Sequence, residues 1–244
     1  MKVRLGGLAA IIGCAALCLA LPALGQNSIT LTGVNGSYSA GDLCSAGIGC
    51  QQVYTGLYYS TVDNTVNTPT ICDDFNHNVT IGETWNATAI NTSSLNGTNI
   101  LQTEFGGTIG LVGYAEVATL VSEIFTLNNG TAALFGGVSN VTGTDLSEAI
   151  WDITTNGGIT GKSANASALV KWVEGLYGSS SAAQAYLNGL SLWILTPAPN
   201  NGPQEFWAAP EGGSALLYLL LAGISCFGAM WFSSRNQSGR RVTA

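Results

Sequence analysis

The single histidine of the chain, His77, lies close to two carboxylates, Asp73 and Asp74. A histidine beside a carboxylate is the arrangement that activates a serine nucleophile in hydrolases, so a serine-type active site here would depend on this residue. The run Asn76-His77-Asn78 is more typical of a turn whose side chains bond the backbone. We therefore predict that the protein is not an enzyme, and we keep a hydrolase as an alternative.

The same segment carries oxygen-bearing side chains at the spacing of a calcium loop, on Asp74, Asn76 and Asn78. Such a loop needs glycine at its sixth position and glutamate at its twelfth, where this chain has Val79 and Trp85. A metal site built from several histidines is excluded as well. We predict no cofactor, and an irregular calcium site is left open.

The cysteines outside the two apolar ends of the chain are the other candidates for chemistry: Cys44, Cys50 and Cys72. Cys44 and Cys50 bracket a short flexible loop and form a candidate disulfide in an oxidising compartment. Pairing them leaves Cys72 as the candidate reactive residue. The usual role of a free cysteine is that of a small buried core residue. Pairing of Cys72 with either loop cysteine also stays open.

Two short motifs around these residues resemble a known family. Ile71-Cys72-Asp73-Asp74 is followed about 75 residues later by Leu146-Ser147-Glu148-Ala149-Ile150-Trp151-Asp152, with an apolar segment at 114–121 between them. This order is similar to the thioester domains of Gram-positive surface adhesins. In that family a cysteine motif and a Gln-x-Ala-apolar-Trp motif form an internal thioester, which captures an amine covalently. The resemblance implies a similar fold over about 70–177.

The chain departs from that family at the residue that completes the bond. Ser147 stands four residues before Trp151, where the family has glutamine. A serine has no amide that could lose ammonia, so Cys72 and Ser147 cannot form the thioester. We therefore carry over the fold and not the reaction. Covalent adhesion through an activated Cys72 with another acyl partner is kept as an alternative.

The elements that must position these residues begin with a β-rich half. Short runs of β-branched and aromatic residues recur between turn residues, at 29–32, 53–59, 70–72, 78–81 and 84–88. The pattern predicts strands, and it places Cys72 in one of them.

From about Gly113 the apolar period becomes helical. The first predicted helix turns Glu116 and Glu123 away from an apolar face made of Tyr114, Val117, Ala118, Val121, Ile124 and Phe125. The next is predicted to start at Asp145, with Glu148 closing a capping box. It buries Trp151 beside its apolar stripe and leaves Ser147 at the surface. Helices from about 165 and over 182–190, then a strand at 192–195, complete an α+β fold. Its β-rich first half is barrel or sandwich-like.

The charge of the central region restricts its partners. Between Gln26 and Ser234 there are 14 acidic residues and only two basic ones, Lys162 and Lys171, so the formal charge is −12. Such a surface repels nucleic acid and anionic lipid, and nucleic-acid binding is excluded. Charged residues make up only 9% of the chain and aromatic residues also 9%, which indicates a folded domain and not a disordered acidic segment.

The start of the chain has the pattern of a signal peptide. Lys2 and Arg4 precede an apolar segment at 5–21, and Ala23-Leu24-Gly25 is a cleavage site of the small-x-small type. Cleavage by signal peptidase would make Gln26 the first residue of the mature protein. A lipoprotein processed at Cys14 is the alternative.

The last 35 residues have the pattern of a sorting signal. Pro210, Glu211 and Gly212 lead into an uncharged apolar segment at 215–232, which is followed by Arg235, Arg240 and Arg241. The segment is long enough for a transmembrane helix, and the arginines place its end in the cytoplasm. The pattern resembles the PEP-CTERM tail of Gram-negative bacteria, which an exosortase recognises. The family usually has a second proline at the position of Gly212, and its arginines are consecutive.

We thus expect a signal peptide at 1–25, an extracytoplasmic α+β domain at 26–196, a linker at 197–209 and a sorting tail at 210–244. The protein would be anchored in the inner membrane during sorting and then reach the cell surface or extracellular matrix. The expected function is structural or adhesive, with an exopolysaccharide or another surface ligand as partner. The alternatives are the covalent adhesin and an exported hydrolase.

Overall fold

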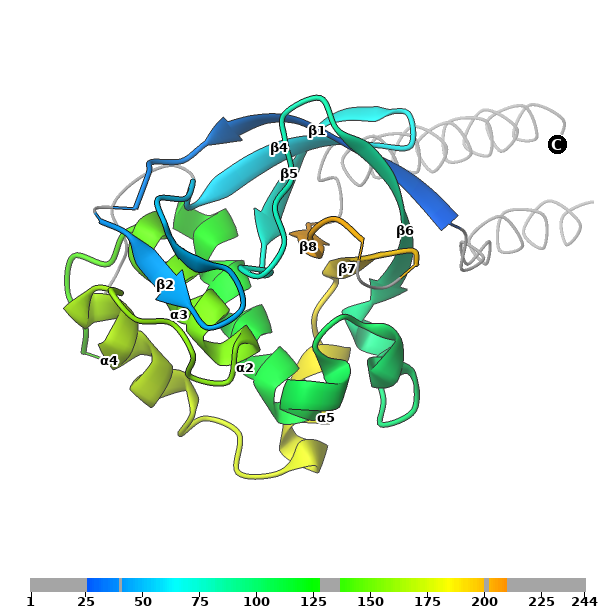
Figure 1. Cartoon of the computed structure of the whole chain (residues 1–244). Helices are drawn as coiled ribbons and strands as arrows, with labels where there is room; N and C mark the ends of the chain where they lie inside the picture. The colour runs from blue at the N-terminus through cyan, green and yellow to red at the C-terminus, as the bar shows by residue number, and fades with distance from the viewer. Residues whose placement is uncertain (1–25, 40, 128–136, 200–201, 210–244) are drawn as a thin grey trace, which may run out of the picture.

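The computed structural model describes residues 26–39, 41–127, 137–199 and 202–209. Within these residues a closed antiparallel β-barrel packs against a layer of helices (Figure 1). The predicted α+β fold with a β-rich part is therefore confirmed. The predicted signal peptide at 1–25 and the tail at 210–244 lie outside the described residues. The same holds for the predicted span at 215–232 and for the motif residues Pro210, Glu211, Gly212, Arg235, Arg240 and Arg241.

The barrel closes in the strand order β1-β4-β5-β8-β7-β6. Its strands are β1 (Gln26–Asn35), β4 (Leu57–Val62), β5 (Thr65–Cys72), β6 (Thr84–Asn91), β7 (Trp193–Pro197) and β8 (Phe206–Ala208). Every neighbouring pair is antiparallel. The barrel interior is filled by one cluster of buried side chains: Ile29, Leu31, Tyr58, Cys72, Trp85, Ala87, Leu195, Phe206 and Ala208.

Alternation along the strands decides which residues face the helices. Successive side chains of a strand point to opposite faces of the sheet. Cys72 and Phe206 therefore join the barrel interior, whereas their neighbours Ile71 and Trp207 belong to the core between barrel and helices. Cys72, the candidate reactive residue, thus lies inside the barrel, where the strands shield it from solvent.

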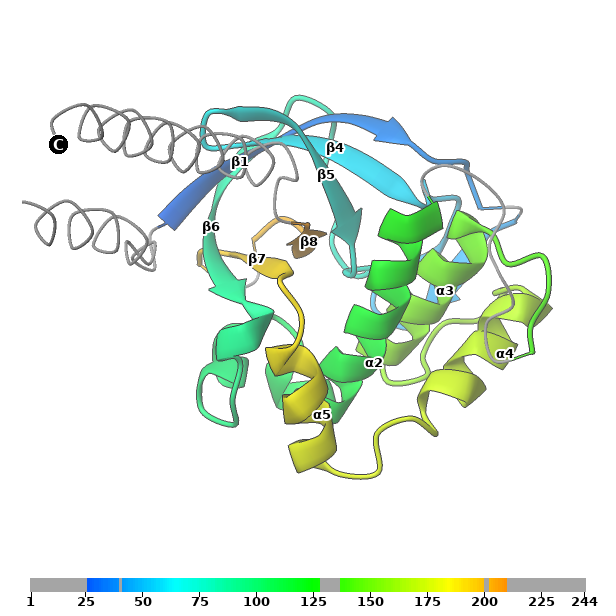
Figure 2. The same cartoon turned by 180° about the vertical axis from the view of Figure 1, so that it is seen from behind.

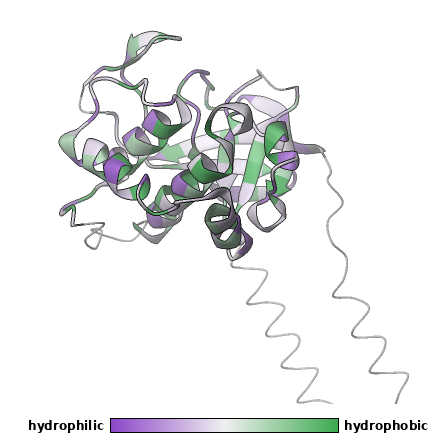
Figure 3. Ribbon diagram, turned by 90° about the horizontal axis from the view of Figure 1, so that it is seen from below, coloured by the Kyte–Doolittle hydropathy of each residue, from purple (hydrophilic) through white to green (hydrophobic). Residues whose placement is uncertain are grey.

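The helical layer consists of α2 (Gly106–Leu127), α3 (Gly143–Thr154), α4 (Ala164–Val173) and α5 (Ser180–Asn188), with short 3₁₀ turns η2 (Thr92–Ser94) and η3 (Asn99–Gln102). α2 packs against α3 and α5, and α3 packs against α4 (Figure 2). Hydrophobic and hydrophilic residues are interleaved along these helices in Figure 3, as expected where one face is buried and another is wet.

Helix α2 is the longest element of the described part. Its backbone leaves the helical conformation at Gly110 (φ 60°, ψ −166°), so the residues before it form a separate turn. By length and composition α2 is the one described helix that could cross a membrane, and 56% of its most apolar window is buried inside the protein. The core helix of a domain meets the same criteria.

The predicted linker at 197–209 is wrong in its second half. Phe206–Ala208 forms β8, which pairs with both β5 and β7, and all three of its residues are buried. Without β8 the facing edges of β5 and β7 would carry unpaired backbone groups. The folded domain therefore extends from Gln26 to at least Ala208. The segment 78–81, predicted as a strand, forms a loop and a turn.

The start of α3 also differs from the prediction. Thr142 and not Asp145 is the N-cap, and Asp145 closes the capping box from the third helical position, with Thr142 N–H donating to Asp145 Oδ2 at 2.8 Å. Glu148 instead accepts the backbone N–H of Ser163 at 2.7 Å, at the start of α4. Burial raises the pKa of Asp145, but hydrogen bonds from Ser163 and Thr142 outweigh it and leave that pKa lowered. Asp145 and Glu148 thus join α3 to Ser163, the N-cap of α4.

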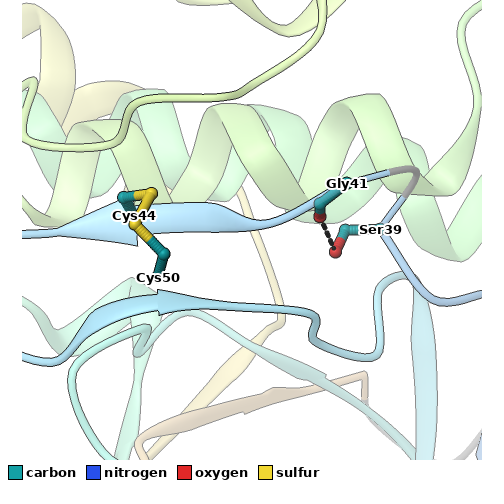
Figure 4. The surroundings of a disulfide bond; sticks show 4 residues. All are labelled: Ser39, Gly41, Cys44 and Cys50. Atoms are coloured by element: carbon teal, nitrogen blue, oxygen red, sulfur yellow. Dashed lines mark hydrogen bonds between the residues drawn. A yellow bond between two sulfur atoms is a disulfide. The ribbon is translucent and has the colours of Figure 1, made fainter.

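A separate hairpin carries the other two cysteines. β2 (Leu43–Ser45) pairs with β3 (Gly49–Gln51), and a disulfide joins Cys44 to Cys50 directly across the pair (Figure 4). Cys44 also exchanges two backbone hydrogen bonds with Thr160, so the hairpin is tied to the segment between α3 and α4. Cys72 is a free cysteine in this arrangement.

Candidate functional site

The candidate site is the region where the end of β5 meets α3. Cys72 is 1% exposed, and its Sγ–H donates to the backbone oxygen of Asp74 at 3.2 Å. Burial, followed by the charges of Asp74 and Asp73, raises the pKa of the Cys72 thiol well above its ordinary value. Because the thiolate is the reactive form of cysteine, this environment keeps Cys72 unreactive.

The structure brings the two sequence motifs together. The indole Nε1–H of Trp151 donates to the backbone oxygen of Cys72 at 3.1 Å. One turn later the hydroxyl of Thr154 donates to the backbone oxygen of Asp73 at 2.8 Å. Trp151 is 2% exposed and packs against Phe75, with ring centroids 5.5 Å apart. α3 is therefore fastened to the end of β5 by two hydrogen bonds to consecutive carbonyl groups.

Ser147 is not a surface residue, contrary to the prediction from helical period. It is 1% exposed, and its Oγ accepts the backbone N–H of Gly56 at 2.8 Å. Gly56 has a positive φ of 86° just before β4 begins. The surface expectation failed because α3 packs against α2 and α4 and is bonded to the end of β5, so ten of its twelve residues are buried. The side chain of Ser147 thus fixes the backbone of Gly56, just before β4 begins.

A buried group of polar side chains lies beside Asp73, at the end of β5, and its central member, Glu205, is not identified by the sequence analysis. Glu205 is fully buried and accepts hydrogen bonds from Tyr114 Oη at 2.6 Å, from Glu104 N–H at 2.9 Å and from the hydroxyl of Thr196. Glu205 lies within the segment 197–209 that the sequence predicts as a linker. The signal that marks it is its place directly before Phe206 and Trp207, an aromatic pair unusual for a linker.

Asp73 faces Glu205 across this group. Its Oδ2 accepts the indole N–H of Trp207 at 2.6 Å, while its Oδ1 is buried without a hydrogen-bond partner. Burial and then the charge of Glu205 raise the pKa of Asp73 well above its ordinary value, and burial raises the pKa of Glu205 too. Glu205 accepts three hydrogen bonds and Asp73 accepts one, so the hydrogen bonds favour the ionised form more strongly at Glu205 than at Asp73.

His77 and Asp74 form the pair that the hydrolase alternative requires. Asp74 Oδ2 lies 2.7 Å from His77 Nδ1, and Asp74 Oδ1 accepts the backbone N–H groups of Asn76 and His77, as in the predicted turn. A cavity of about 400 Å³ is lined by His77 and by Ser45. The Ser45 hydroxyl donates to Asn76 Oδ1 at 3.2 Å, so this serine is not engaged by the histidine.

The spacing considered for calcium does not assemble a site in the described part of the chain. Asp74 is fully buried, and its Oδ1 is occupied by the two turn N–H groups. Among residues 26–39, 41–127, 137–199 and 202–209, no three His, Cys, Asp or Glu side chains lie close enough together to hold a metal ion.

Glu116 was predicted to point to solvent and is instead 7% exposed. Burial, followed by the charge of Glu174, raises its pKa from 4.5 to about 7. A raised pKa in the folded state means that the fold is favoured while Glu116 is neutral and loses that advantage as it ionises. We therefore expect the free energy of unfolding to fall between pH 4.5 and about 7, and the raised pKa values of Asp73 and Glu205 act in the same direction.

The Glu116→Gln variant checks this pH dependence. Its melting temperature should decline less than that of the parent chain as the pH is raised through this interval, because glutamine has no proton to lose. Asp42→Asn, on an exposed loop, is the control and should leave the decline unchanged. Identical pH profiles for the Glu116→Gln variant and the parent would show that Glu116 ionises freely in the folded protein.

No family model, no curated protein and no solved structure matches this chain.

Proposed function

We propose that this chain is an exported, exosortase-sorted protein of the cell surface or extracellular matrix, and that its role is structural or adhesive without catalysis. The proposal of a role without catalysis is supported by the hydrogen bonds and burial of Cys72 and Ser147. The thiol of Cys72 donates to Asp74 and the hydroxyl of Ser147 accepts from Gly56, and both side chains are buried. Both positions serve the fold, and neither presents a group to a substrate.

Export is supported by the two ends of the sequence and by the hairpin. The pattern at 1–25 would be read by signal peptidase, and Pro210, Glu211 and Gly212 with the following apolar segment would be read by an exosortase. The disulfide between Cys44 and Cys50 is of a kind that persists in oxidising compartments. A charge of −12 between Gln26 and Ser234 suits a protein that stays soluble outside the cytoplasm.

The covalent adhesin is the second candidate, and one observation favours it. The cysteine motif and the tryptophan motif, far apart in the sequence, meet through the bond from Trp151 to the carbonyl of Cys72. The resemblance to thioester domains implies such a contact between the two motifs. An acyl partner other than residue 147 would then have to reach a thiol that is 1% exposed.

Truncation of the tail tests the sorting proposal. Deleting 215–244 should leave a folded protein that is released from the cell, because β8 ends at Ala208 and the whole barrel remains. The matched control deletes 203–244, which also removes Glu205 and β8, and it should yield an unfolded or degraded product. Immunoblots of medium and membrane fractions, with circular dichroism of the released protein, measure both. Retention of the shorter deletion in the membrane fraction would contradict the proposed sorting signal.

A further inference from the structure

A groove with an unusual lining lies at the barrel. It borders the surroundings of Cys72, because its lining residue Gln204 donates to the same backbone oxygen of Asp74 as the Cys72 thiol. It has a volume of about 350 Å³ and is formed by β1, by the loop that precedes β4 and by the loop at 78–81. We call it the tyrosine groove, and its polar and aromatic lining residues are Tyr38, Gln51, Gln52, Tyr54, Tyr58, Asn78, Thr80 and Gln204. None of its described lining residues is charged, in a region whose formal charge is −12.

Two exposed tyrosines line the groove. Tyr38 and Tyr54 are 55% and 36% exposed, and their rings stack with centroids 4.0 Å apart at 28°. Their backbones form an antiparallel bridge, flanked by the hydrogen bonds Ser39 N–H to Val53 O at 2.9 Å and Thr55 N–H to Ser37 O at 2.8 Å. The pair is therefore a prepositioned aromatic surface. Exposed aromatic side chains held in this way are enriched at binding sites.

The amide side chains of the groove have free hydrogen-bonding capacity. Gln52 is exposed and makes no hydrogen bond to the described residues, and Asn78 accepts only a long bond of 3.5 Å from Gln51. Gln204 uses its N–H groups on the backbone oxygens of Asp74 and His77, which leaves its own side-chain oxygen as an acceptor. Amides offer donors and acceptors side by side, so the groove can bond groups that do both.

We propose that the tyrosine groove binds a neutral polysaccharide chain. A sugar ring presents C–H groups on its faces, which suit the negative face of an aromatic ring, and hydroxyl groups at its edge, which both donate to and accept from amides. The volume lies within the range of known ligand sites. The inference rests on the proposed surface or matrix role and names the ligand class of its adhesive site.

Two other occupants fit less well. An anionic polysaccharide would meet no positive side chain in the groove and would approach an acidic domain, so the Coulomb energy opposes it. A proline-rich peptide also stacks on aromatic grooves. Its prolines have no N–H, however, and would leave the acceptors on Gln52 and Gln204 unused.

Calorimetric titration of the full chain tests the proposal, in a detergent without a sugar headgroup. The probes are cellohexaose, laminarihexaose and maltohexaose as neutral chains, oligogalacturonate as an anionic chain and a ten-residue proline peptide. We expect at least one neutral probe to bind. The double variant Tyr38→Ala and Tyr54→Ala should weaken that binding on the order of tenfold or more, since each ring contributes a stacking contact.

Two further variants locate the binding. Replacing both tyrosines by phenylalanine should retain most of the affinity, because the rings remain. Leu101→Ala, at a 64% exposed apolar side chain far from the groove, should change nothing. Binding of no neutral probe, binding that survives the double alanine variant, or binding of the proline peptide alone would each overturn the proposal. If no neutral sugar binds but the chain lacking 215–244 is released normally, only the groove proposal fails and the sorting proposal stands. The two experiments therefore distinguish the two proposals.

Discussion

Replacing Trp151 by alanine should lower the free energy of unfolding by about 3–5 kcal/mol. Trp151 is 2% exposed and fills the space between α3 and the end of β5, where it packs on Phe75. Its removal leaves a cavity that the surrounding barrel and helices cannot fill. It also leaves the buried carbonyl of Cys72 without the indole N–H that it accepts at 3.1 Å. Denaturant unfolding of the mature chain measures the loss.

Two variants of the same helix serve as comparisons. Trp151→Phe keeps a ring in the cavity and loses the hydrogen bond, so it should cost clearly less than Trp151→Ala. Ser147→Ala should cost about 1–3 kcal/mol, because the buried N–H of Gly56 loses its acceptor. A cost of several kcal/mol for Ser147→Ala together with a small cost for Trp151→Ala would contradict the packing described for α3.

The second large effect is expected at Glu205. Glu205→Ala should destabilise the fold by about 3–5 kcal/mol, because three donors, on Glu104, Tyr114 and Thr196, would lose their acceptor, each at a cost of about 1–3 kcal/mol where it is buried. Glu205 thereby joins β7 of the barrel to α2 and to the segment before α2. Equilibrium unfolding followed by tryptophan fluorescence measures this loss.

Asp73→Asn is the matched control for Glu205→Ala. Asparagine can still accept the indole N–H of Trp207 through its side-chain oxygen. The substitution also removes the Asp73 carboxyl, whose ionisation is disfavoured by the charge of Glu205. At neutral pH we therefore expect little loss or a gain in stability. A loss for Asp73→Asn equal to that of Glu205→Ala would mean that Asp73, and not Glu205, carries the charge.

The residues that could be placed from sequence are those whose role depends on local pattern. The strand-like run that ends at Cys72 and the helical stripe around Trp151 both depend on nearest neighbours, and the structure has both residues in the cores expected of them. The short loop between Cys44 and Cys50 made their pairing a natural candidate, and a disulfide joins them in the structure.

The residues that sequence could not place depend on partners far away in the chain. β8 has only three residues and follows a proline-rich stretch, so only its pairing with β5 and β7 identifies it as a strand. Glu205 was missed for the same reason. Ser147 and Glu116 are polar residues on helices, where period alone predicts exposure. Both are buried because their helices are packed on more than one side.

The most direct test of the central claim is the mass of the mature protein before and after treatment with methylamine. We expect no adduct and no loss of ammonia, because Cys72 is a buried thiol and position 147 has no amide. The untreated mass should match a chain with one disulfide and no other internal bond. A stoichiometric gain of one methylamine that disappears in Cys72→Ala would contradict the account and establish a covalent adhesin.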